Sequence, residues 1–251
     1  MTLRLEMHGA EAHLVIDRAA KRNAFDMAMW TALPRLLASA AEDPEARLLV
    51  LRAGDEGAFC AGADIGELLA NKDNAQWRAT NQSAINRAQF ELARFPLPTL
   101  AFVDGDCIGG GCGLAMACDL RVATPRARFG ITPAKLGLVY PLHDVKLLTD
   151  LVGPGQAKRL LFTGSLVEAE EALRIGLVEA LAEEIAMFAE PILAASPSST
   201  RAIKGFIRRV LDGQVHDDAD TISVFAAAFN GPDFLEGTSA FADKRKPEFK
   251  R

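Results

Sequence analysis

Two short apolar runs, 48–51 and 99–103, each lead into a loop built mainly of small residues. Apolar runs of this length are typical of strands buried on both faces. Helical patterns follow both loops, and strands that alternate with helices indicate an α/β core. Loops at the carboxyl ends of such strands are common ligand sites. We therefore expect loops 58–65 and 104–113 to form a binding site.

The rest of the chain divides into two parts. Residues 12–17 and 120–123 have strand character, whereas about 26–42 and 76–95 have helical apolar spacing. Within the second helix we expect the inward-facing side chains to be Trp77, Ile85, Phe90 and Leu92. Beyond residue 142 the strand signal almost vanishes, and 154–247 predict successive helices punctuated by glycine and proline.

Composition and charge exclude several classes of protein. The net charge is −5 without a dense basic stripe, which argues against nucleic acid as the main partner. The four cysteines lie among apolar residues and the four histidines are scattered, so we predict buried reduced thiols and no metal site. No apolar run is long enough to cross a membrane, and the N-terminal residues lack the apolar block of a signal peptide. We expect a cytoplasmic protein.

Gly110 lies where a glycine-rich loop enters a helix. Free N–H groups and the helix dipole favour negative charge at such a point. Taken alone, three consecutive glycines are more often a close-packing device. A dinucleotide-binding motif fails because Leu114 stands at the third glycine position. In the other loop Asp64 precedes Glu67 by three residues, which predicts a helix N-cap rather than an acid catalyst.

The combination of segments is more informative than any one of them. They occur in order along the chain at 21–24, 59–65, 109–112, 127–130, 161–164, 172–178 and 236–247. Together they resemble the enoyl-CoA hydratase/isomerase (crotonase) superfamily over nearly the whole length. The resemblance implies a spiral of ββα units, with a core over 1–190 and a helical region over 191–251 for oligomerisation and for covering coenzyme A. A homotrimer or a dimer of trimers is expected.

The same resemblance implies the roles of individual residues. The backbone N–H groups of Ala63 and Gly110 form an oxyanion hole for a thioester enolate. Coenzyme A enters as part of the substrate rather than as a resident cofactor. Further residues match positions that hold or cover the coenzyme A carrier, the last two often from a neighbouring subunit: Lys21, Arg22, Ala24, Ala61, Ile65, Phe225 and Lys244.

The sequence departs from a standard hydratase at both catalytic glutamates, which are replaced by Gly113 and Pro133. Acid–base help is worth about 10²–10⁴-fold, so ordinary crotonyl-CoA hydration should be slow. Isomerisation, decarboxylation and an unusual hydration remain open, as does a non-catalytic acyl-CoA binder. Thr132 and Pro133 belong to a stretch similar to methylmalonyl-CoA decarboxylases and are expected to line the substrate pocket. The candidate replacement proton carriers, each with an equally plausible structural role, are Tyr140, His143 and Asp144.

Overall fold

The computed structural model describes residues 2–54 and 57–249. Its main sheet has the strand order β1-β2-β3-β4-β6-β9, and every neighbouring pair is parallel except β1 and β2. The strands are β1 (Leu3–His8), β2 (Glu11–Ile16), β3 (Leu48–Ala53), β4 (Thr99–Val103), β6 (Leu120–Ala123) and β9 (Ala180–Leu181). A second sheet has the order β5-β7-β8, from β5 (Asp106–Ile108), β7 (Arg128–Gly130) and β8 (Leu166–Glu168).

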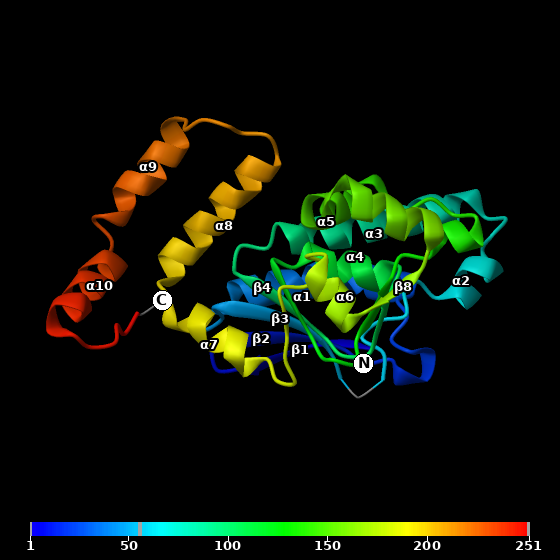
Figure 1. The fold of residues 1–251 in the computed structure, drawn as a ribbon, viewed down its shortest axis with the longest axis horizontal. Helices are drawn as coiled ribbons and strands as arrows, with labels where there is room; N and C mark the ends of the chain where they lie inside the picture. The colour runs from blue at the N-terminus through cyan, green and yellow to red at the C-terminus, as the bar shows by residue number, and fades with distance from the viewer. Residues whose placement is uncertain (1, 55–56, 250–251) are drawn as a thin grey trace.

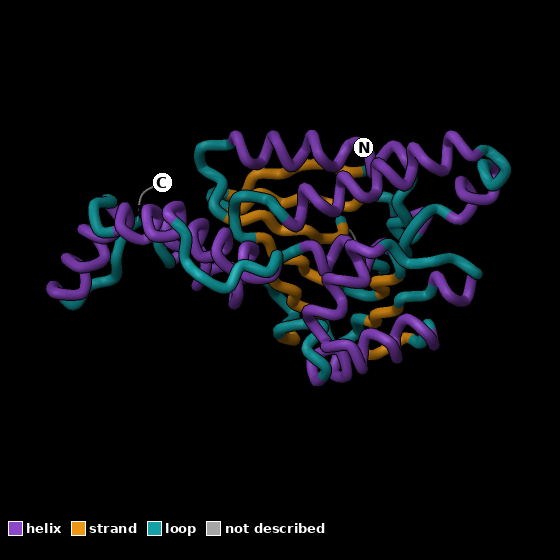
Figure 2. Tube along the Cα trace, turned by 90° about the horizontal axis from the view of Figure 1, so that it is seen from above, coloured by secondary structure: helices purple, strands orange, loops and turns teal. Residues whose placement is uncertain are grey.

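The described helices pack around the main sheet, except for the last three, which extend away from it (Figure 2). They are α1 (Met27–Glu42), α2 (Ile65–Ala70), α3 (Ala75–Ala93), α4 (Gly110–Ala117), α5 (Leu142–Thr163), α6 (Ala169–Arg174), α7 (Ala186–Ala194), α8 (Pro197–Leu211), α9 (Ala219–Ala228) and α10 (Pro232–Asp243), with short 3₁₀ turns η1 (Ala19–Lys21) and η2 (Pro133–Leu136).

Strand β3 shows why an unbroken apolar run belongs in the middle of this sheet. Its residues Leu48 and Val50 pack with Ala189 of α7, whereas Leu49 and Leu51 face the larger core on the other side. Alternate side chains along a strand point to opposite faces, so a strand between two helical layers needs apolar residues at every position. The predicted α/β core is confirmed.

The last three helices leave the core. Figure 1 shows α8, α9 and α10 projecting from one end of the sheet, with α9 beside α8. Several large apolar side chains are exposed here, including Phe225 at 65% and Phe241 at 88%. The expected boundary at 190/191 falls inside α7, whose Ala189 packs on β3, and the projecting part begins at α8.

Two expectations about the elements are wrong. Strands β8 and β9 lie beyond residue 142, where the sequence showed only helices, but they are three and two residues long. They form because β7 and β6 supply the pairing partners. On α3, Phe90 is 48% exposed, with the Arg94 guanidinium 4.2 Å from its ring centre, and Gln89 is buried instead.

The predicted N-cap and the predicted buried thiols are confirmed. The Asp64 side chain accepts a hydrogen bond from the Glu67 N–H at the start of α2, as an N-cap does. All four cysteines are free and buried. Within the described residues no cluster of three metal-ligating side chains exists, and no described helix has the length and apolarity to cross a membrane.

Candidate functional site

The loop after β3 turns the Ala63 N–H toward the loop after β4. Phe25 N–H donates to the Gly62 oxygen at 2.8 Å, and Asp64 N–H donates to the Phe25 oxygen at 2.8 Å. In this parallel bridge the N–H of the intervening residue, Ala63, points away from Phe25. Gly62 has φ +98°, and a Cβ at that position would lie 2.9 Å from the Ile108 oxygen. Glycine is therefore required for the two loops to approach this closely.

Backbone hydrogen bonds hold the two loops side by side. Cys60 N–H donates to the Asp106 oxygen at 3.0 Å, and Ile108 N–H donates to the Cys60 oxygen at 2.9 Å. Gly110 then begins α4, and a Cβ built on it would lie 3.7 Å from the Ala63 nitrogen. Among the backbone bonds between described residues outside the helices and strands, none uses the N–H of Ala63 or Gly110. Two neighbouring donors are available to a ligand.

Tyr140 supports one of these donors from behind. Its hydroxyl donates to the Gly109 oxygen at 2.9 Å. That oxygen belongs to the same peptide group as the Gly110 N–H, so the bond fixes the orientation of the peptide and polarises it. Burial, and secondarily the nearby Asp144 carboxylate, raise the pKa of Tyr140 well above its usual value. The phenol therefore remains a donor at neutral pH.

Three helices meet at Gly113, three residues beyond Gly110 on α4. A Cβ at Gly113 would overlap Gln89 Nε2 of α3 and would lie 3.0 Å from Asp144 Oδ2 of α5. Gln89 and Asp144 are each 1% exposed. The space beside the bare α4 backbone is thus filled by a carboxylate and an amide from the two neighbouring helices.

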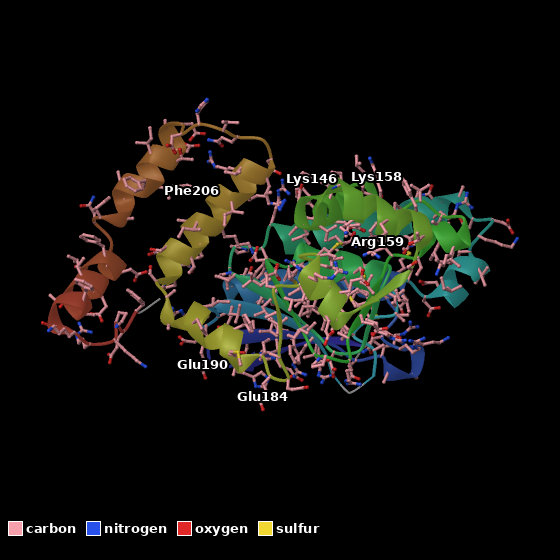
Figure 3. The ribbon with its side chains drawn as sticks, viewed as in Figure 1. Lys146, Lys158, Arg159, Glu184, Glu190 and Phe206 are labelled. Atoms are coloured by element: carbon pink, nitrogen blue, oxygen red, sulfur yellow. The ribbon has the colours of Figure 1, made fainter. Side chains whose placement is uncertain are left out.

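Helix α5 presents its two faces differently. Its outer surface carries Lys146 and Lys158, which point away from the core (Figure 3). Asp144 in the first turn points inward, where the helix dipole favours negative charge. His143 Nδ1 lies 3.4 Å from Asp144 Oδ1, and His143 Nε2 is buried without a hydrogen-bond partner among the described residues. His143 and Asp144 lie in the first turn of the helix that follows Pro141, which is the structural role that the sequence also allowed.

The expected coenzyme A residues of the core form one rim. Ala61 N–H donates to the Arg22 oxygen at 3.0 Å, which brings segment 21–24 against segment 61–65. Arg22 pairs with Asp106, and Ile65 is 45% exposed. Thr132 and Pro133 lie at the start of η2, directly after β7. The structure therefore brings Lys21, Arg22, Ala24, Ala61 and Ile65 together next to Ala63.

The other two residues expected to contact coenzyme A lie far from this rim. Phe225 is on α9 and Lys244 directly follows α10, and Figure 1 shows both helices far from α2 and α4. Conversely, Gln89 was missed by the sequence reasoning. The only sign of its burial in the sequence is its position three residues before Leu92, which places it on the buried side of α3.

The comparisons with known proteins agree with one another. The enoyl-CoA hydratase/isomerase family model matches residues 7–251. A crotonyl-CoA hydratase from Syntrophomonas wolfei is 33% identical, over 98% of this chain and 96% of that protein. A short-chain-enoyl-CoA hydratase from Clostridium acetobutylicum is 30% identical, over 97% of this chain and 95% of that protein.

Solved structures show the same fold. An enoyl-CoA hydratase/isomerase family protein from Hyphomonas neptunium superposes with a TM-score of 0.95 at 39% identity, covering 100% of this chain and 98% of that one. An enoyl-CoA hydratase from Bacillus anthracis gives a TM-score of 0.93 at 28% identity, covering 100% and 99%. The match in sequence and fold spans the loops that carry Ala63 and Gly110. The chain belongs to the enoyl-CoA hydratase/isomerase family.

Proposed function

We propose that the chain binds an acyl-CoA thioester with its carbonyl oxygen between the N–H groups of Ala63 and Gly110. The observation that carries this proposal is the convergence of two backbone donors that no described residue uses. Negative charge that develops on the oxygen as an enolate forms would be stabilised there. Single donors of this kind are worth about 2.7–4 kcal/mol. The rim formed by segments 21–24 and 61–65 would hold the coenzyme A carrier.

Asp144 is the proton carrier in this proposal. It supplies from α5 the carboxylate that Gly113 cannot supply from α4, because its Oδ2 lies 3.0 Å from the Cβ position of Gly113. Tyr140 has its hydroxyl committed to the Gly109 oxygen and acts as a positioning residue for the Gly110 donor. His143, 3.4 Å from the carboxylate, borders Asp144.

Addition of water to an enoyl thioester suits this arrangement better than decarboxylation does. The relatives named above are hydratases, and a carboxylate beside the oxyanion hole favours a group that donates a proton to it. The carboxylate of a malonyl-type thioester would instead meet the Asp144 carboxylate, and like charges repel. With one carboxylate in place of two, hydration should still be slower than in a standard hydratase.

A substrate panel tests the proposed function. Crotonyl-, malonyl- and methylmalonyl-CoA are incubated with the parent and with Asp144→Asn, which keeps the side-chain shape. Asp150→Asn is the matched control, because Asp150 lies on the same helix and pairs with exposed Lys146. We expect hydration of crotonyl-CoA that falls about 10²–10⁴-fold in Asp144→Asn and is unchanged in Asp150→Asn.

The other outcomes are equally informative. Rapid hydration by Asp144→Asn contradicts the assignment of the proton carrier. Turnover of the malonyl-type thioesters alone favours the decarboxylase. Binding of all three thioesters without turnover of any favours a non-catalytic acyl-CoA-binding protein.

A homotrimer, or a dimer of trimers, is also part of the proposal. Helices α8 to α10 expose large apolar side chains at the end of the molecule farthest from α2 (Figure 1). Phe225 and Lys244 are too far from the rim of their own chain to cover it, but a neighbouring subunit could receive them. Light scattering at micromolar concentration measures the mass, and a monomer would contradict this part.

A further inference from the structure

Gln89 is a buried amide whose hydrogen-bonding groups are unused. Its side chain lies on α3 and is 1% exposed, and neither Oε1 nor Nε2 has a partner among the described residues. Buried polar groups are nearly always hydrogen-bonded, because desolvation is costly without a partner. An amide left in this state beside a candidate site points to a ligand group that satisfies it.

The polar ends of Gln89 and Asp144 converge beside Gly113. Nε2 of Gln89 overlaps the Cβ position of Gly113, and Asp144 Oδ2 lies 3.0 Å from that position. The amide offers two N–H donors and one acceptor, whereas the carboxylate only accepts. A water or hydroxyl oxygen matches both, since it can accept from Nε2–H and donate its own hydrogen to Asp144. A methylene group of an acyl chain would satisfy neither.

This polar pair also lies at a suitable distance from the proposed oxyanion donors. Gly110 and Gly113 are three residues apart on one face of α4, which corresponds to a rise of about 4.5 Å. A thioester oxygen held at Gly110 therefore places the β-carbon of the acyl group, two bonds from the carbonyl carbon, near Gly113. The oxygen to be bound is the one attached at that β-carbon.

We propose that Gln89 and Asp144 form a subsite for a β-oxygen: the attacking water before hydration and the β-hydroxyl of the product after it. This inference rests on the proposed function. As the water oxygen bonds to the β-carbon, Asp144 takes a proton from that water and the double-bond electrons move to form the enolate. The same proton then passes from Asp144 to the α-carbon, which regenerates the carboxylate. Gln89 transfers no proton and fixes the position of the oxygen.

Calorimetry with two ligands tests the subsite. 3-Hydroxybutyryl-CoA and butyryl-CoA differ only in the β-hydroxyl, and each is titrated into the parent, into Gln89→Met and into the exposed control Gln76→Met. We expect the parent and the control to bind the hydroxylated thioester about 5- to 10-fold more tightly, as one extra hydrogen bond allows. Gln89→Met should show a smaller preference for the hydroxylated thioester, because only the hydrogen bond from the hydroxyl to Asp144 remains. The kcat of Gln89→Met for crotonyl-CoA hydration should also fall, which tests whether the subsite binds the attacking water.

Stability separates a ligand-binding role from a structural one. Methionine has a similar length and brings no buried polar atoms, so Gln89→Met should be at least as stable as the parent in urea. A large loss of stability would show that the amide supports the fold instead. Equal binding of both thioesters by the parent would overturn the subsite and leave the proposed function intact. Failure of the parent to bind either thioester would overturn the proposed function itself.

Discussion

Replacing Tyr140 by phenylalanine removes one hydroxyl and preserves the packing of the ring. The structure sets the size of the effect, because that hydroxyl makes one hydrogen bond to the residues that the structure describes, to the Gly109 oxygen at 2.9 Å. The same oxygen also accepts from the Gly113 N–H at 3.1 Å, so it keeps a partner in the variant. The loss is therefore one net hydrogen bond, about 0.5–1.5 kcal/mol. In kcat this amounts to roughly 2- to 13-fold.

A proton carrier would behave differently, because its loss costs about 10²–10⁴-fold. The assay is kcat for the best substrate of the panel, measured on the parent and on Tyr140→Phe between about pH 6 and pH 9. Since burial raises the pKa of Tyr140 well above its usual value, phenol ionisation should not shape the profile in that range. A loss beyond a hundredfold, or a profile that changes shape, would refute the role assigned to Tyr140.

Two further predictions concern packing and the thiols. Gly113→Ala should lower the urea midpoint of unfolding, because overpacking against buried Gln89 costs about 1–3 kcal/mol and exceeds the helix-propensity gain of about 1 kcal/mol. The control Gly205→Ala lies in open space on α8 and should raise the midpoint. A rise for Gly113→Ala would contradict the packing. Burial raises the pKa of Cys60 and of Cys118 to about 12, so iodoacetamide at about pH 8 should label neither thiol in the native protein and both after unfolding. Labelling of either native thiol would refute this.

The approach of loops 58–65 and 104–113 could be predicted from the sequence because its signal is local. Glycine marks a backbone position that needs a positive φ or a close approach; Gly62 has both features, whereas Gly109 has the positive φ. The end of a strand and the start of a helix are also local patterns. The meeting of the two loops could therefore be expected from the residues, whereas the roles of Ala63 and Gly110 came from the family resemblance.

The polar subsite could not be predicted, because its members come from different helices. The register along α4 shows only that a side chain is missing at Gly113. That Asp144 of α5 and Gln89 of α3 fill the space depends on how three helices pack. On α3 the hydrophobic pattern favoured burying Phe90, but its ring stacks with Arg94 at the surface and leaves the inward position to the neighbouring amide.

The kcat of Gly110→Pro relative to that of Gly110→Ala tests whether the Gly110 N–H stabilises the thioester oxygen. Gly110 is the first residue of α4, where proline is tolerated, so the fold should survive while the N–H is lost. Alanine keeps the donor and adds the same Cβ, which lies 3.3 Å from Trp30 Cζ2 and so serves as the steric control. The oxyanion assignment predicts that the proline variant is slower than the alanine variant by about 10²–10³-fold. Equal rates in two folded variants would contradict it.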